Sequence, residues 1–267
     1  MQKLLQLFFV GLVAGGLTAC GSGGNAAPKV NEGDPPPADD TAEVVQEVIP
    51  TPQNLTATIK GKVTLKGVPP AMTVLKMLVA ECITAHPNGL PKAEDVVTGP
   101  GGSLANCFVH IKKGVSGRFP RPKEPVTLDQ KGCMYKPHIV GLRPRQTLLV
   151  TTSDPTLHNV HTLPKLNPEL NKAQKKGDPP LELSFRKAEV MVKVKCEVHT
   201  WMNAYIGVVD HPYFAITGAD GMFEFPEKIA PGTYTVEVWH EFYKTKTQEI
   251  TVGAGDTEQT VNFEFSS

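Results

Sequence analysis

The stretch KVKCEVHTWMN, residues 193–203, places three metal-binding side chains at intervals of three residues. They are the thiol of Cys196, the imidazole of His199 and the thioether of Met202. In the preceding residues, EVMVKVK, every second residue is a valine, and Val190, Val192 and Val194 share one face of a predicted strand with Cys196. We therefore expect the thiol to end a buried strand, with the other two donors following in a short turn around one point.

A second segment, DPTLHNVHTL at residues 154–163, offers a fourth ligand. His158 and His161 are an odd number of positions apart, so they face opposite sides of an extended strand. His158 shares its face with Val160, and we expect it, rather than His161, to reach the site. A bulge between the two histidines would reverse this expectation.

The donor set identifies the metal. One thiolate, two imidazoles and a weak axial thioether form the ligand set of blue-copper centres. Structural zinc sites instead repeat Cys or His pairs and do not recruit methionine. The sequence therefore predicts one type 1 copper ion, with an ordinary strand end as the alternative. Such a centre passes single electrons and needs no substrate pocket.

The HNV run at His158 and the CxxHxxM run ending at Met202 resemble the cupredoxins, the small blue-copper proteins that include plastocyanin and amicyanin. The resemblance covers roughly residues 126–210 and implies a Greek-key cupredoxin sandwich. By this resemblance Asn159 braces the cysteine loop through hydrogen bonds. The implied ligands are His158, Cys196 and His199 as equatorial donors and Met202 as the axial donor.

Two features depart from the amicyanin pattern. Thr200 stands where amicyanin-like loops tend to carry proline. The connection LPKLNPELNKAQKKGDPP, residues 163–180, is longer than expected and has no strand pattern. We predict a loop there, and its length leaves the choice of redox partner open.

The rest of the chain after residue 54 also alternates like β-structure. In TIKGKVTLKG, residues 58–67, the apolar side chains of Ile59, Val63 and Leu65 share one face and lysines occupy the other. NCFVHIKKG, TYTVEVWHE and TVNFEF repeat this pattern, and 24 glycines with 24 prolines supply the turns between them. The predicted class is therefore all-β, with a sandwich as the expected architecture.

The two flanks of the predicted copper domain resemble halves of another module. IKGKVTLKGVPP with NCFVHIKKG resembles the opening strands of a transthyretin-like or carboxypeptidase-regulatory-like β-sandwich, and ITGADGMFEFPEKIAPGTYTVEVWHE resembles its closing strands. The resemblance implies a structural or binding accessory. We expect residues 55–118 and 212–267 to form it, and residues 119–211 to form a cupredoxin domain inserted in it or packed beside it.

The amino terminus predicts export and lipid attachment. Residues 1–20 combine an early lysine, an uncharged apolar run and small residues, as in a signal peptide. Leu17–Cys20 resembles a bacterial lipobox, which implies lipidation of Cys20. Residues 21–54 form an acidic Pro/Gly-rich tether of net charge −5. We expect a protein of the bacterial cell envelope, anchored to a membrane by lipid, either periplasm-facing or on the outer membrane.

The five cysteines can be assigned in part. Cys20 is expected to carry lipid and Cys196 to bind metal, while Cys107 lies on an apolar strand face, which favours a buried free thiol. This leaves Cys82 and Cys133 as a candidate disulfide in a compartment that permits one. A pairing that uses Cys107 remains open.

The remaining features narrow the function. Residues 55–267 have a net charge of +4, which is no footprint for nucleic acid. The chain has no nucleophile elbow, phosphate loop or HExxH motif, so we predict neither an enzyme nor a small-molecule substrate. The leading hypothesis is a lipid-anchored carrier of single electrons between redox proteins. The alternative is a lipoprotein that stores copper or serves a structural, adhesive role without transferring electrons.

Overall fold

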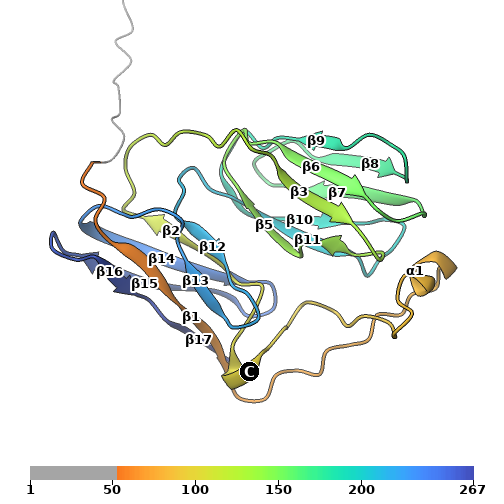
Figure 1. Cartoon of the computed structure of the whole chain (residues 1–267), viewed down its shortest axis with the longest axis horizontal. Coiled ribbons are helices and arrows are strands. Elements are labelled where there is room, and N and C mark those ends of the chain that lie inside the picture. Colours follow the sequence, from red (N-terminus) through yellow and green to blue (C-terminus); the bar gives the residue numbers. More distant parts are fainter. Residues whose placement is uncertain (1–52) are drawn as a thin grey trace, which may run out of the picture. The chain divides into compact units, whose positions relative to one another are not determined.

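The computed structural model describes residues 53–267, whose regular secondary structure is almost entirely β-strand (Figure 1). The predicted signal peptide, Cys20 and nearly all of the tether lie outside the described residues. Within these residues the single α-helix is α1 (Ala80–Thr84), and no helix there is long and apolar enough to cross a membrane. The prediction of an all-β protein is confirmed.

The first sandwich is built from strands near both ends of residues 53–267. One sheet has the order β13-β1-β16, and β17 also pairs with β1; the other has the order β12-β2-β14-β15. Strands of residues 55–118 and of residues 212–267 therefore share both sheets. The strands are β1 (Thr58–Lys66), β2 (Phe108–Lys113), β12 (Phe214–Ile216), β13 (Met222–Glu224), β14 (Gly232–His240), β15 (Lys244–Val252), β16 (Glu258–Thr260) and β17 (Phe263–Ser266).

The second sandwich is built from the residues between these two groups. Its sheets have the orders β4-β3-β6-β9 and β5-β11-β10-β7-β8. The strands are β3 (Val126–Gln130), β4 (Tyr135–Lys136), β5 (Ile139–Leu142), β6 (Leu148–Thr152), β7 (His158–Leu163), β8 (Leu170–Gln174), β9 (Leu181–Leu183), β10 (Glu189–Lys195) and β11 (Asn203–Val208).

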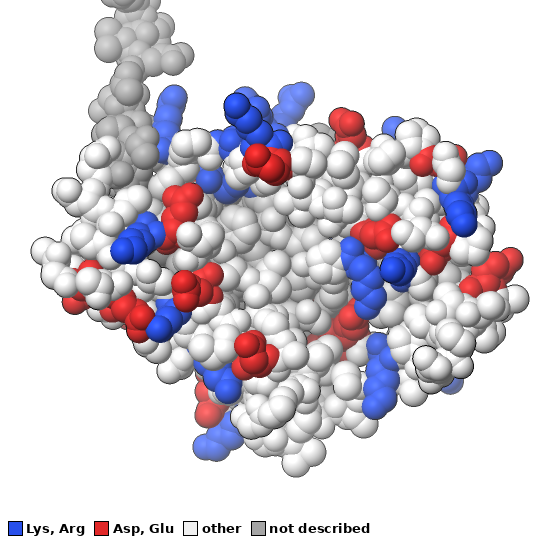
Figure 2. Space-filling model, in the orientation of Figure 1, with Lys and Arg blue, Asp and Glu red and all other residues white. Residues whose placement is uncertain are grey.

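Each sandwich has its own apolar core, formed by the faces that the alternation predicts. Ile59, Val63 and Leu65 of β1 are buried in the first core. Val192 and Val194 of β10 are fully buried in the second, together with Cys196. The polar positions of these strands face solvent, and on the face drawn in Figure 2 the positive and negative side chains are interspersed.

The prediction of a loop over residues 163–180 was wrong. β8 lies within that range and pairs antiparallel with β7, with His161 opposite Asn171. β8 is an edge strand of its sheet, and Asn171, Lys172 and Ala173 are exposed. An edge strand is held by backbone hydrogen bonds along one side and needs no buried apolar face, so its sequence lacks the alternation that marks the other strands.

Aromatic side chains of the first sandwich pack against β5 and β11 of the second. Phe108 of β2 is buried with Ile139 of β5 and with Val209. A Cβ atom added at Gly207 of β11 would lie 2.4 Å from the Phe108 ring, and one added at Gly141 would lie as close to Phe214. Glycine at these two positions therefore allows the rings to lie directly against the sheet.

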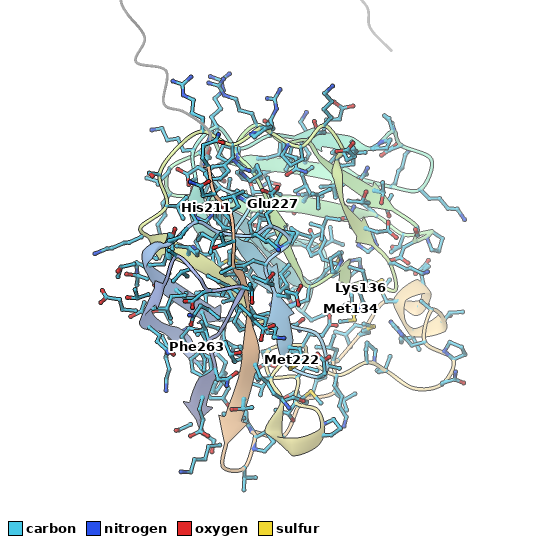
Figure 3. The ribbon with its side chains drawn as sticks, turned by 60° about the vertical axis from the view of Figure 1, so that its left-hand side comes forward. Met134, Lys136, His211, Met222, Glu227 and Phe263 are labelled. Atoms are coloured by element: carbon cyan, nitrogen blue, oxygen red, sulfur yellow. A yellow bond between two sulfur atoms is a disulfide. The ribbon has the colours of Figure 1, made fainter. Side chains whose placement is uncertain are left out.

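Residues 67–103, here called the cover segment, leave the first sandwich after β1 and return before β2 (Figure 1). The segment contains α1 and the 3₁₀ turn Pro100–Gly102. A disulfide between Cys82 of α1 and Cys133 joins it to the second sandwich. Met134, the residue after Cys133, lies on the side of the second sandwich next to this segment (Figure 3).

Candidate metal centre

The predicted ligand loop connects two antiparallel strands of the second sandwich. β10 ends at Lys195 and β11 begins at Asn203. The N–H of Cys196 donates to the carbonyl of Met202 over 3.0 Å, and the N–H of Met202 donates to the carbonyl of His199 over 2.9 Å. These two bonds close a tight turn, so the side chains of all three predicted donors belong to one compact loop.

The structure brings His158, Cys196 and His199 together. The Nδ1 atoms of the two histidines are 3.1 Å apart, and Nδ1 of His199 is 3.8 Å from Sγ of Cys196. The three donor atoms lie within 4.8 Å of one another, and the three side chains are buried. Met202, 1% exposed, packs in the same core cluster as Cys196.

His161 is directed elsewhere. Its ring nitrogens contact the carboxylates of Glu197 and Glu169 at the surface. The alternation of β7 explains the difference, because His158 and His161 leave the strand on opposite faces and only the first faces the core.

We predict that His158→Ala abolishes the centre and that His161→Ala retains it. The first change removes a buried donor, whereas the second removes a surface ion pair worth about 1 kcal/mol or less. Copper stoichiometry and the visible spectrum after dialysis against Cu(II) measure the difference. Equal loss of copper from both variants would contradict the assignment of His158.

Asp154 orients His158, a role that sequence reasoning missed. Nε2 of His158 donates to Oδ2 of Asp154 over 2.9 Å, and this carboxylate also accepts from the N–H groups of Gly132 and Cys133, each over 2.7 Å. With Nε2 held by Asp154, Nδ1 faces Cys196 and His199 and is the nitrogen that would lose its proton to bind a metal. The only sequence signal was an aspartate four residues before the histidine, in a Ser-Asp-Pro stretch typical of a turn.

Asn159 and Tyr135 hold the ligand loop to β7. Oδ1 of Asn159 accepts from the N–H of Glu197 over 3.0 Å, and its Nδ2 donates to Asn171. The hydroxyl of Tyr135 donates to the carbonyl of Asn159 over 2.6 Å and contacts that of Lys195. The sequence indicated Asn159 through the family resemblance but gave no sign of the tyrosine, which comes from a different sheet.

The surroundings of Cys196 favour its thiolate. Burial alone raises the pKa of this thiol, but a hydrogen bond with His158 and the N–H groups of His199, Asn159 and Val198 outweigh it, so the pKa lies below its ordinary value. Burial likewise lowers the pKa of His158, but the hydrogen bond to Asp154 and the contact with Cys196 raise it overall. The thiolate is the form that binds soft metals.

The cover segment closes the outer side of the site. Sγ of Cys82 lies 3.5 Å from Nε2 of His199, and Nε1 of Trp201 donates to the carbonyl of Cys133 over 3.0 Å. His199 is fully buried as a result. Cys107 remains a free thiol in the first core, where burial raises its pKa to about 12. Cys82 therefore pairs with Cys133, and Cys107 takes no part in the disulfide.

No protein-family model and no curated protein sequence matches the chain. Among solved structures, similarity extends to a copper-containing nitrite reductase from Thermus scotoductus SA-01, with 17% identity over 38% of this chain and a TM-score of 0.30. The chain covers only 25% of that protein. The chain is also similar to the Cu(I) form of a mutant amicyanin, with 16% identity and a TM-score of 0.29. The match covers 38% of this chain and 98% of the amicyanin chain.

A purple cupredoxin from Nitrosopumilus maritimus is also similar, with 18% identity, coverage of 32% of this chain and 99% of that chain, and a TM-score of 0.27. TM-scores this low assign neither a fold nor a function. The case for a metal therefore depends on the side chains. The ligand loop supplies a thiolate-forming cysteine, one imidazole and a buried thioether, and His158 of β7 supplies the second imidazole.

Proposed function

We propose that this protein carries single electrons between redox partners, using one type 1 copper ion, and that a lipid on Cys20 anchors it in the bacterial cell envelope. The observation that supports it best is the convergence of Nδ1 of His158, Nδ1 of His199 and Sγ of Cys196 in a buried position. Lipid attachment is supported by the Leu17–Cys20 sequence alone. No enzymatic step and no nucleic acid partner belong to this proposal.

The donors fit copper by their chemistry. A soft thiolate suits Cu(I), imidazole suits both oxidation states, and a buried thioether at Met202 supplies a weak fourth donor. Copper bound there supplies a one-electron couple. Mg²⁺ or Ca²⁺ would require oxygen ligands, and Asp154, the carboxylate that contacts His158, already accepts three hydrogen bonds.

The protein's own contribution is to restrict the movement of these ligands and to exclude water from them. Asp154 fixes His158, and Asn159 with Tyr135 fixes the start of the ligand loop. The cover segment excludes water from His199. Ligands that are held by a rigid sheet on one side and a disulfide-bonded segment on the other need move little when an electron arrives or leaves, and a small rearrangement makes transfer fast.

The spectrum of the copper-loaded protein tests the proposal. Cu(II) added to the purified protein should give one equivalent of bound copper with intense visible absorption from the Cys196 sulfur and the electron-spin signature of a type 1 centre. A colourless protein that takes up only zinc would refute it.

One observation favours copper storage or delivery as a second candidate. The imidazole edge of His199 is covered by the Cys82–Cys133 disulfide, so the ligand is not exposed to a docking partner. Cyclic voltammetry separates the two candidates. A fast, reversible couple supports the carrier, whereas a sluggish and irreversible one supports storage.

We predict that Met202→Leu keeps the colour and shifts the reduction potential. Leucine fills the buried volume of the thioether, and the three strong donors remain. At a fixed applied potential, the Cu(II)/Cu(I) ratio should fall or rise by about tenfold, which corresponds to a shift of about 59 mV for a one-electron couple. Spectroelectrochemical titration measures the shift, with Met222→Leu at the surface of the first sandwich as the matched control.

A further inference from the structure

The cover segment meets the second sandwich in a small buried cluster that is rich in sulfur. Its four buried members are Met77 and Cys82 from the cover segment and Cys133 and Met134 from the second sandwich. Trp201 of the ligand loop packs against them. Aliphatic side chains would fill this volume equally well, whereas thiols and thioethers are the donors that select Cu(I).

His199 directs its second ring nitrogen into this cluster. The histidines that bind metals usually donate their outer N–H to a carboxylate, a backbone carbonyl or water, as Nε2 of His158 does to Asp154. Nε2 of His199 departs from this rule. Its one hydrogen-bonding contact in residues 53–267 is Sγ of Cys82, at 3.5 Å, and the side chain is fully buried. A buried nitrogen donor thus faces a sulfur atom instead of an oxygen atom.

We propose that reduction of the Cys82–Cys133 disulfide creates a second metal site, selective for Cu(I), formed by the two thiolates and Nε2 of His199. These three donor atoms lie within 4.8 Å of one another, and their side chains are buried. The imidazole of His199 would then face one site with Nδ1 and the other with Nε2. The new site needs neither Cys196 nor His158, so it does not depend on the proposed electron carrier.

An external dithiol is the reductant for the Cys82–Cys133 disulfide. The dithiol gives two electrons and two protons, the sulfur–sulfur bond between Cys82 and Cys133 breaks, two S–H bonds form, and the dithiol becomes a disulfide. Cu(I) then binds without changing its oxidation state and displaces the two thiol protons. When Nδ1 of His199 already holds copper, the proton on Nε2 leaves as well. In the disulfide form the cover segment is covalently joined to the second sandwich, and in the dithiol form the same two cysteines bind metal.

An anaerobic titration of Cu(I) against a chromophoric Cu(I) chelator tests the proposal. The disulfide form should retain one equivalent, and the protein reduced with a phosphine should retain two. A thiol assay on the same samples establishes that Cys82 and Cys133 are reduced. A reduced protein that shows both new thiols but still retains one equivalent would overturn the second site.

The Cys196→Ser background separates this proposal from the electron carrier, because its second site is intact. Reduction should add one equivalent of Cu(I) there, although the blue colour is gone. Alkylation of the two reduced thiols in that background should abolish the added equivalent of Cu(I). Replacing both cysteines, Cys82→Ser with Cys133→Ser, should abolish it to the same extent. An added equivalent that survives alkylation refutes the site. X-ray absorption at the copper edge should show predominantly sulfur ligands for it.

Discussion

Replacing Cys196 by serine will abolish the intense visible absorption of the copper-loaded protein. That absorption requires a thiolate on the metal, and serine offers a hard oxygen that stays protonated at neutral pH. The thiol is buried at the end of β10, and its hydrogen bonds with His158 and the backbone N–H of His199 lower its pKa. The serine oxygen would inherit these contacts but not the soft donor.

Optical spectra and a Cu(I) competition assay measure this effect. We expect the affinity to fall by more than the roughly 10- to 100-fold that follows loss of an outer partner of a metal ligand. Cys107→Ser is the matched control, since it makes the same change at a buried thiol in the core of the first sandwich. The control should lose stability and keep its colour. A blue Cys196→Ser protein would refute the ligand assignment.

The ligands could be predicted because strand periodicity is a local property. Alternation placed Cys196 with the buried valines of β10 and placed His158 opposite to His161, and both side chains lie as this pattern indicates. The contacts around them were not predictable in the same way. Cys82 reaches His199 across 117 positions of sequence, from a five-residue helix with no periodic pattern. The role of Asp154 likewise depends on a distant segment, because its carboxylate accepts hydrogen bonds from the N–H groups of Gly132 and Cys133.

The same distinction applies to the fold. The buried faces of β1 and β14 followed from alternation, as did the all-β class. Which strands pair did not follow, because β1 pairs parallel with β16 and β17, whose register is set by packing rather than by any turn. β8 was missed because an exposed edge strand lacks a buried face.

Gly61→Ala should cause the largest loss of stability among the glycine substitutions in the first sandwich. Gly61 lies in the middle of β1, opposite Phe223 of β13. A Cβ atom there would lie 1.7 Å from the carbonyl oxygen of Val261, which is backbone and cannot swing aside, and 2.9 Å from the Phe223 ring. Val261 is itself held in place, because its N–H donates to the carbonyl of Lys60 over 2.8 Å.

Relief of this overlap requires β1 and the Val261 segment to separate, which disrupts the only sheet contacts that join residues 58–66 to residues 258–266. Overpacking in a core typically costs about 1–3 kcal/mol, and a clash with fixed backbone should reach about 3 kcal/mol or more. Denaturant titration measures the free energy of unfolding, with Gly255→Ala as the control because a Cβ atom there meets nothing within 4 Å. A Gly61→Ala protein as stable as that control would mean that the backbone of Val261 does not lie against β1 as described. The visible spectrum of the folded variant should be unchanged, because the copper ligands lie in the other sandwich.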